Sequence, residues 1–322
     1  MRTFKKKLLF LALTISCLNL QAQHSFDGTI KNNSLAISPD ESIAIASNSD
    51  SLRVKVYDLK TNKCIKSIEG FVNPRNILFS PDGKLFYITD SSLGQLLVFN
   101  TKELKVIKTY PIGYGAFGSA INRDGTLIFV NNEATNTVSV LDLTTQSIKS
   151  IITGFAQPRQ GIKINPDNTK VYVTNFANDR IYVVDIATLS IESTIVGFNK
   201  IRAISILKNG SKLFAANSGT NTIAIVDIAT KKIVKLIPVG KDPYGASLSP
   251  DESILLSGNK VDNSLTLIDV ASLESKGTIT GFKEPRQALI FSRNGELVYV
   301  LNNDLSISVA NVMDQKIIKT MF

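Results

Sequence analysis

A short turn-forming tetrad, Ser-Pro-Asp-Glu or Ser-Pro-Asp-Gly in its fullest copies, recurs seven times along this chain of 322 residues. The copies start at residues 38, 80, 122, 165, 207, 249 and 292, so successive starts are 42 or 43 residues apart. A fixed period of this length is typical of solenoids, propellers and other repeat architectures. One supersecondary unit is therefore built seven times, and neighbouring units must bury each other's apolar faces.

Each repeat contains four short β-like segments. In the fourth repeat they span residues 160–164, 170–175, 180–186 and 190–196, are rich in Val, Ile, Tyr and Thr, and are separated by turn residues. No segment keeps a 3.6-residue apolar period, so we expect little helix. Four strands per repeat predict an all-β fold, a seven-bladed β-propeller of four-stranded blades.

The last repeat supplies all of its own strands, which bears on how the ring closes. We expect closure mainly by side-chain packing between the first and last blades, with at most a short N-terminal strand from Phe26 to Ile30.

Residues 1–22 have the pattern of a secretory signal. A basic start that includes Arg2 is followed by the uncharged apolar run Leu8 to Leu20 and by Ala22 at a cleavage position. The run is too short for a relaxed transmembrane helix. We therefore expect an exported protein, in the periplasm or at the cell surface, whose mature residues 23–322 form a single propeller.

The predicted signal bears on how the chain is anchored and on its net charge. Residues 14–17, Thr-Ile-Ser-Cys, loosely resemble a bacterial lipobox, so lipid anchoring through Cys17 is the alternative to a cleaved soluble chain. Four basic and no acidic residues lie in 1–23, so their removal lowers the formal net charge from +9 to +5. That mild excess permits an acidic partner without requiring one.

A family resemblance becomes specific in the fourth repeat. The segment Val171 to Asn175 (Val-Tyr-Val-Thr-Asn), followed by Ile181 to Asp185 and Thr188, resembles the YVTN-repeat family of β-propellers, whose soluble bacterial members are the YncE-like exported proteins. The resemblance covers roughly residues 30–322 and implies the propeller fold. It also implies single-stranded nucleic-acid binding as an alternative function, although basic and aromatic residues interleave only thinly here.

The side-chain inventory excludes several kinds of site. Two Cys and one His are too few for a zinc cluster or a dense disulfide framework. His24 lies beside the predicted cleavage point, so the body of the chain has no Ser-His-Asp or Cys-His arrangement. The uniform repeats also leave no inserted loop for catalytic residues. We therefore expect a non-catalytic binding or scaffold module, a monomer with no metal or cofactor, whose partner is a protein or an anionic ligand.

Three repeated or isolated features are interpreted as structural. An Asp or Asn ends the third segment of each repeat, where its side chain should accept backbone N–H bonds in a turn. A Phe follows a Gly at four crossovers and is expected to pack between blades. Cys64 is interpreted as a small residue of an outermost strand. The turn residues are Asp58, Asn100, Asp142, Asp185, Asp227, Asp269 and Asn311, and the aromatic ones are Phe71, Phe155, Phe198 and Phe282.

One set of aligned residues is a candidate binding site. In the topology that the resemblance implies, the start of each first strand lies at one mouth of the channel, opposite the tetrad turns. Arg presents a planar fork of donors that suits phosphate or carboxylate, and aromatic rings can stack on bases or sugars. The hypothetical ligand-binding residues are Asn33, Arg75, Phe117, Arg159, Arg202, Tyr244 and Arg286.

The same alignment places one extra residue after Arg159 and one after Arg286, which suggests a bulge at each. It also places an Asn or Asp from each second-to-third loop on the same face, with Asn131 in the third repeat.

Two interpretations of the aligned Arg residues stay open. Their heads could be solvated and bind an anion, or each could pair with a neighbouring carboxylate or carbonyl and seal the mouth. The alternative function is a lactonase-like propeller hydrolase, which needs a carboxylate near the Arg residues. The candidates for it are Asp90, Glu133 and Asp304.

Overall fold

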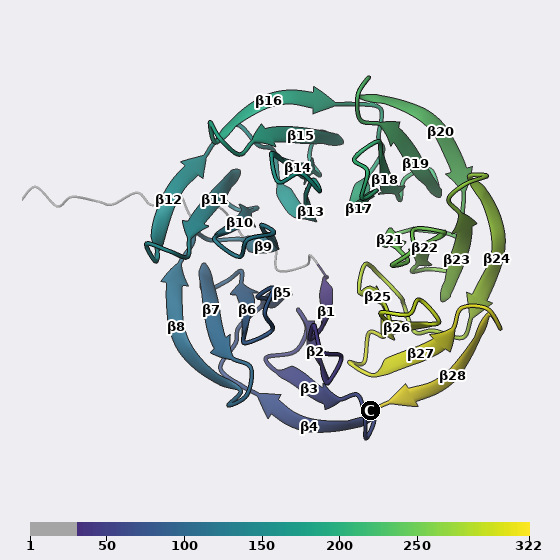
Figure 1. The fold of residues 1–322 in the computed structure, drawn as a ribbon, viewed down its shortest axis with the longest axis horizontal. Coiled ribbons are helices and arrows are strands. Elements are labelled where there is room, and N and C mark those ends of the chain that lie inside the picture. The colour runs from purple at the N-terminus through teal and green to yellow at the C-terminus, as the bar shows by residue number, and fades with distance from the viewer. Residues whose placement is uncertain (1–30) are drawn as a thin grey trace, which may run out of the picture.

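The computed structural model describes residues 31–322, and this range contains 28 strands and no helix. The strands form seven separate four-stranded antiparallel sheets, arranged as blades around a common axis (Figure 1). The predictions of seven blades and of little helix are therefore confirmed. The predicted signal, Cys17, His24 and the short strand expected from Phe26 to Ile30 lie outside the described residues.

In every blade the strands follow chain order from the channel to the rim (Figure 1). The innermost strands are β1 (Asn33–Ile37), β5 (Pro74–Phe79), β9 (Ala116–Ile121), β13 (Pro158–Ile164), β17 (Ile201–Ile206), β21 (Ser247–Leu248) and β25 (Leu289–Phe291). The second strands are β2 (Ile43–Asn48), β6 (Leu85–Asp90), β10 (Leu127–Asn132), β14 (Lys170–Asn175), β18 (Lys212–Asn217), β22 (Ile254–Asn259) and β26 (Leu297–Leu301). The third strands are β3 (Val54–Asp58), β7 (Gln95–Asn100), β11 (Thr137–Asp142), β15 (Arg180–Asp185), β19 (Thr222–Asp227), β23 (Ser264–Asp269) and β27 (Ile307–Asn311). The outermost strands are β4 (Lys63–Ile68), β8 (Lys105–Pro111), β12 (Ser147–Ile152), β16 (Ser190–Ile195), β20 (Lys232–Pro238), β24 (Glu274–Thr280) and β28 (Lys316–Met321).

The apolar core lies between the blades. A second strand such as β14 is buried on both faces, because each blade is covered by a neighbour on either side. The seven clusters of buried apolar side chains each span two adjacent blades. Phe71, Phe155, Phe198 and Phe282 all belong to such clusters, so the prediction that they pack between blades is confirmed.

The ring closes between blades one and seven by side chains, as expected. The Tyr57 hydroxyl of β3 donates a hydrogen bond of 2.5 Å to the carbonyl of Leu305, which follows β26. The Asn48 amide donates across the same junction to the Asn303 carbonyl at 2.7 Å. Leu35, Tyr57 and Ile307 share one buried cluster at this junction.

The predicted role of the third-strand Asp and Asn residues is confirmed. The Asp58 carboxylate accepts the backbone N–H of Thr61 at 2.6 Å, and Asn100 accepts that of Glu103 at 3.0 Å. Corresponding bonds form at Asp142, Asp185, Asp227, Asp269 and Asn311.

The tetrad turns couple neighbouring blades in two alternative ways. Where the second tetrad residue is Pro, the next tetrad along the chain ends in Gly, and a Cβ on Gly83 would lie 3.1 Å from Pro39 Cδ. Where the second tetrad residue is Arg or Lys, the next tetrad ends in Asn or Glu. The side-chain oxygen of that Asn or Glu accepts the backbone N–H of the Arg or Lys. These bonds are Arg123 to Asn168 at 3.3 Å, Lys208 to Glu252 at 2.6 Å and, across the closure, Arg293 to Glu41 at 2.7 Å.

Candidate functional site

Three of the four aligned Arg residues lie in one row with aromatic rings. The guanidinium carbon of Arg159 is 3.8 Å from the centroid of the Phe176 ring. Arg202 lies between two rings, 4.6 Å from Phe176 and 4.3 Å from Tyr244. Arg286 continues the row at 5.6 Å from Tyr244. The repeat therefore brings together residues from four successive blades, each contact being of the cation–π type. We call these five residues the Arg–aromatic row.

Phe176 was missed by the sequence analysis. It directly follows the Val-Tyr-Val-Thr-Asn segment, in the second-to-third loop of the fourth blade. Its position on the same face as the start of the first strands was the signal that could have found it.

Arg75, the fourth Arg, is separated from the row and fully buried. Its guanidinium stacks 4.3 Å from the Phe117 ring, and its Nε donates to the Ser91 hydroxyl at 2.8 Å. Burial lowers the pKa of Arg75 to about 10, although the carboxylates of Asp90 and Glu133 act in the opposite direction. Arg75 stays protonated at neutral pH and helps to seal the wall of the mouth.

The members of the row differ in their polar partners. Arg159, 16% exposed, lies 3.8 Å from a Glu133 oxygen, and Arg286, 9% exposed, lies 3.4 Å from a Glu284 oxygen. Arg202 donates from Nε to the Ser218 hydroxyl at 3.1 Å and forms no ion pair with a carboxylate within residues 31–322. The sealing interpretation thus fits Arg75 and Arg286, while Arg159 and Arg202 keep part of their surface open.

A network of amide side chains crosses the channel beneath the row. The Asn32 side-chain amide donates to Oε1 of Gln160 at 3.0 Å, and the Gln160 side-chain amide donates to Oδ1 of Asn76 at 2.6 Å. Gln287 donates to the Asn32 side chain and, at 2.6 Å, to the Asn33 carbonyl. We call Asn32, Asn76, Gln160 and Gln287 the amide plug; none of them was singled out from the sequence.

The two extra residues of the repeat explain how Gln reaches the axis. Pairing in β13–β14 moves from Pro158 opposite Asn175 to Ile162 opposite Val173, which confirms the predicted bulge after Arg159. In the last blade the strand begins only at Leu289, so Gln287 precedes the ladder. In both repeats the residue after Arg is the Gln of the plug.

The mouth has little free volume. About 30 Å³ of open space remains among the plug and the side chains of Phe117, Arg159, Phe176, Arg202 and Tyr244. One water molecule occupies roughly this volume in the liquid. A ligand would therefore rest on the Arg–aromatic row from outside rather than enter the channel. Asn33 is buried and donates to the Leu301 carbonyl at 3.3 Å, so it does not face such a ligand.

The carboxylates proposed for a hydrolase have separate positions. Asp90 accepts the backbone N–H of Val72 at 2.7 Å, and Asp304 pairs with Lys283 at 2.7 Å. Of the three, Glu133 alone contacts a residue of the row. The residues aligned with Asp90 also make hydrogen bonds within the fold; they are Asn48, Asn175, Asn217, Asn259 and Asn302. In the third blade the matching residue at the end of β10 is Asn132, so the choice of Asn131 from the alignment was wrong.

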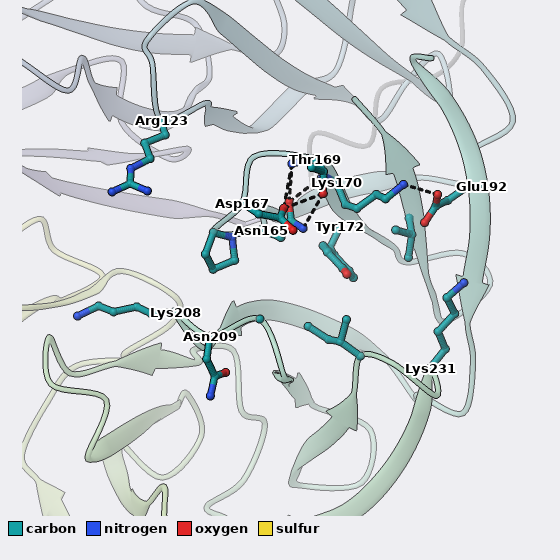
Figure 2. Close-up of a pocket in the computed structure, with 14 residues that line it drawn as sticks. Arg123, Asn165, Asp167, Thr169, Lys170, Tyr172, Glu192, Lys208, Asn209 and Lys231 are labelled. Atoms are coloured by element: carbon teal, nitrogen blue, oxygen red, sulfur yellow. Dashed lines mark hydrogen bonds and ion pairs between the residues drawn. The ribbon is translucent and has the colours of Figure 1, made fainter. Parts of the chain in front are cut away.

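A larger groove opens on the tetrad face, between blades four and five (Figure 2). It encloses about 560 Å³, and Lys170 on one wall is neutralised by Asp185 and Glu192 at 2.6 and 2.5 Å. Arg123 and Lys208 lie together at one end, away from Lys231 (Figure 2). A Cβ on Gly210 would meet nothing within 4 Å, which shows that the tetrads of blades four and five are spread apart here.

Residues 31–322 contain no helix that is long and apolar enough to span a membrane, and no cluster of three metal-ligating side chains. Cys64 lies on the outermost strand β4, as predicted, and is a free thiol.

Protein-family models match most of the described chain. The model described as YNCE-like beta-propeller matches residues 198–318. The model described as Lactonase, 7-bladed beta-propeller matches residues 31–190 and 100–243, which together exceed half of the chain. Together the two models cover residues 31–318. The chain belongs to the YncE-like and lactonase-type β-propellers. No curated protein matches it significantly.

Among solved structures, this YncE-like propeller resembles hydrazine synthase of Kuenenia stuttgartiensis. The TM-score is 0.78 at 19% identity, over 86% of this chain and 94% of that one. At this identity the likeness shows the shared fold and nothing of activity.

Proposed function

We propose that this YncE-like propeller is a non-catalytic binding module that takes an anionic ligand on its Arg–aromatic row. One observation carries the proposal: Arg159, Arg202 and Arg286 alternate with Phe176 and Tyr244 along one mouth. A guanidinium presents a planar fork of donors that suits phosphate or carboxylate, and stacking on a ring leaves that fork at the edge of the stack.

The arrangement suits a polymer or an extended surface more than a small molecule. The open space at the mouth is only about 30 Å³, so contacts are made across the row. Arg202 is central, because it touches both rings and has no carboxylate partner within the described residues.

The test is a titration of three fluorescent anionic polymers: polyphosphate, poly-glutamate and a single-stranded oligonucleotide. We expect saturable binding at low salt that weakens as salt is raised, because exposed charges are screened over about 10 Å at 0.1 M. The Arg159→Ala, Arg202→Ala double variant should bind at least tenfold more weakly. Arg180→Ala is the control, since Arg180 is an exposed Arg at the start of β15, directly after the loop that contains Phe176.

The three probes separate the sources of the anion. Preference for the oligonucleotide would identify nucleic acid as the ligand, and equal binding of all three would identify charge alone. Equal losses in the double variant and in Arg180→Ala would overturn the assignment of the row.

We also propose that the protein is exported. The basic start, the apolar run and Ala22 support cleavage after residue 22. Mass spectrometry of the protein from its native membrane and soluble fractions tests this. A mature chain that starts at residue 23 is expected. A mature chain that starts at a lipid-modified Cys17 would identify the anchored alternative, and an intact Met1 would refute export.

A hydrolase is the second candidate, favoured by the lactonase family match and by Glu133 beside Arg159. Incubation with aliphatic and sugar lactones, followed by proton release, tests it. Turnover that Glu133→Gln abolishes would replace the binding proposal.

A further inference from the structure

A second cavity lies inside the channel, on the other side of the amide plug from the mouth. It holds about 200 Å³, which is room for several waters at roughly 30 Å³ each. Gln160 and Gln287 line both this cavity and the small space at the mouth, so the plug separates the two. We call the inner cavity the channel chamber.

One residue gives the channel chamber its charge. Lys163 on β13 is the only charged residue among those that line it, and no Asp or Glu is among them. The residues at the matching place in the other repeats are uncharged: Ala36, Leu78, Ala120, Ser205, Ser247 and Ile290. The repeat therefore carries a single cation at this level of the channel.

The Lys163 amine has no protein partner within residues 31–322. It forms no ion pair and no side-chain hydrogen bond there, although its surface is open to the channel. Desolvation by the surrounding blades lowers the pKa of Lys163, and no carboxylate acts in the opposite direction. The residues that line the chamber therefore offer this exposed cation no counter-charge, and an anion that enters the chamber can supply one.

We propose that the channel chamber is a binding site for a small oxyanion, held by the Lys163 ammonium. Three ammonium hydrogens can each donate to an oxygen. The Ser247 hydroxyl also lines the chamber and makes no hydrogen bond among the described residues, so it is free to donate to the same ligand. The plug closes the end toward the mouth, where the Arg residues would otherwise compete for the anion.

The site differs from the Arg–aromatic row in size and access. The chamber accepts an ion such as phosphate, sulfate or acetate, whereas the row contacts a polymer from outside. The two sites share no charged residue, so each can fail without the other.

The test is calorimetric titration of the protein with sodium phosphate, in a chloride background of matched ionic strength. Sulfate and acetate serve as parallel probes. We expect one saturable site in the wild-type protein and a rise in melting temperature over the same concentrations, because a ligand that binds only the folded state stabilises it. Lys163→Met should remove both signals, and Ser247→Ala should weaken binding several-fold.

Two controls make the outcome decisive. Lys102→Met removes an exposed Lys beside β8 and should leave phosphate binding unchanged. The Arg159→Ala, Arg202→Ala variant should also keep the site. Should Lys163→Met fail to fold, Lys163→Gln provides the same test. Absence of saturable binding in the wild type, or undiminished binding without the Lys163 charge, would overturn the proposal.

Discussion

At the scale of single residues, side chains at equivalent positions of the repeat differ in their burial and in their roles. Arg75 and Arg202 both start the first strand of their blades, and both donate from Nε to a Ser hydroxyl. Arg75 is nevertheless fully buried beneath its neighbours, while Arg202 is only partly covered. The alignment could predict that these residues share one mouth, but burial depends on the neighbouring blade, which the repeat pattern does not describe.

This difference predicts unequal costs of truncation. Arg75→Ala should lower the free energy of unfolding by about 3 kcal/mol, because it empties buried volume and removes a buried hydrogen bond. Arg202→Ala should cost less than about 1 kcal/mol, as is usual for a partly exposed charge. Urea denaturation of both variants is the measurement. Similar losses in the two would show that the blades bury them alike.

At the scale of the turn, the sequence was most informative. The tetrad Asp and the third-strand Asp were predictable because a short acceptor side chain satisfies nearby N–H groups without any tertiary contact. The pairing of Pro with Gly, and of Arg or Lys with Asn or Glu, was not predicted, although it is visible in the sequence. The pairing arises from contacts between neighbouring blades. Pro has no N–H to donate to the next blade, and its ring occupies the space that a side chain there would need.

Acid should weaken these turns in a defined pH range. Hydrogen bonds from the Ser249 hydroxyl and from Ser253 hold the pKa of Asp251 at about 2, below its usual value of 3.8. Its contribution to stability is therefore complete above pH 4 and is lost as the pH falls through 2. Asp251→Asn keeps the turn, since Asn294 in the last repeat accepts the Ser292 hydroxyl at 2.6 Å and the Glu296 N–H at 3.1 Å. Urea midpoints of wild type and variant should converge from pH 4 to pH 2; parallel curves would contradict the assignment.

The Pro–Gly pairing predicts a second contrast. Gly83 and Gly210 both have φ of +70°, so replacement by Ala costs each about 1 kcal/mol from backbone strain. A Cβ at Gly83 also lies 3.1 Å from Pro39, whereas at Gly210 it meets nothing within 4 Å. Gly83→Ala should therefore be the more destabilising in thermal melts. Equal shifts would mean that the blade-one turn yields to the methyl group without cost.

At the scale of the whole molecule, the period predicted the number of blades and of strands in each blade, and the family resemblance implied the place of the mouth. The amide plug and the channel chamber were not foreseen. They depend on which side chains meet at the axis from blades distant in sequence, as when Gln287 reaches Asn32. A repeat alignment compares positions within blades and carries no information on such encounters. The one exception is the pair of extra residues after Arg159 and Arg286. They signalled a local departure in both repeats, and the first forms a bulge in the fourth blade.

Closure of the ring is the last property that can be tested at this scale. Blades one and seven are not consecutive in the chain, so side chains must hold this junction, and the Tyr57 hydroxyl is bonded to the Leu305 carbonyl. Tyr57→Phe should lower the free energy of unfolding by about 1–2 kcal/mol, because the buried carbonyl is left without its donor. Tyr87 is the matched control: it is 3% exposed, and its hydroxyl makes no hydrogen bond within residues 31–322. Tyr87→Phe should change stability little, since no bond is lost. Equal effects in chemical denaturation would show that the bond between Tyr57 and Leu305 does not stabilise the closed ring.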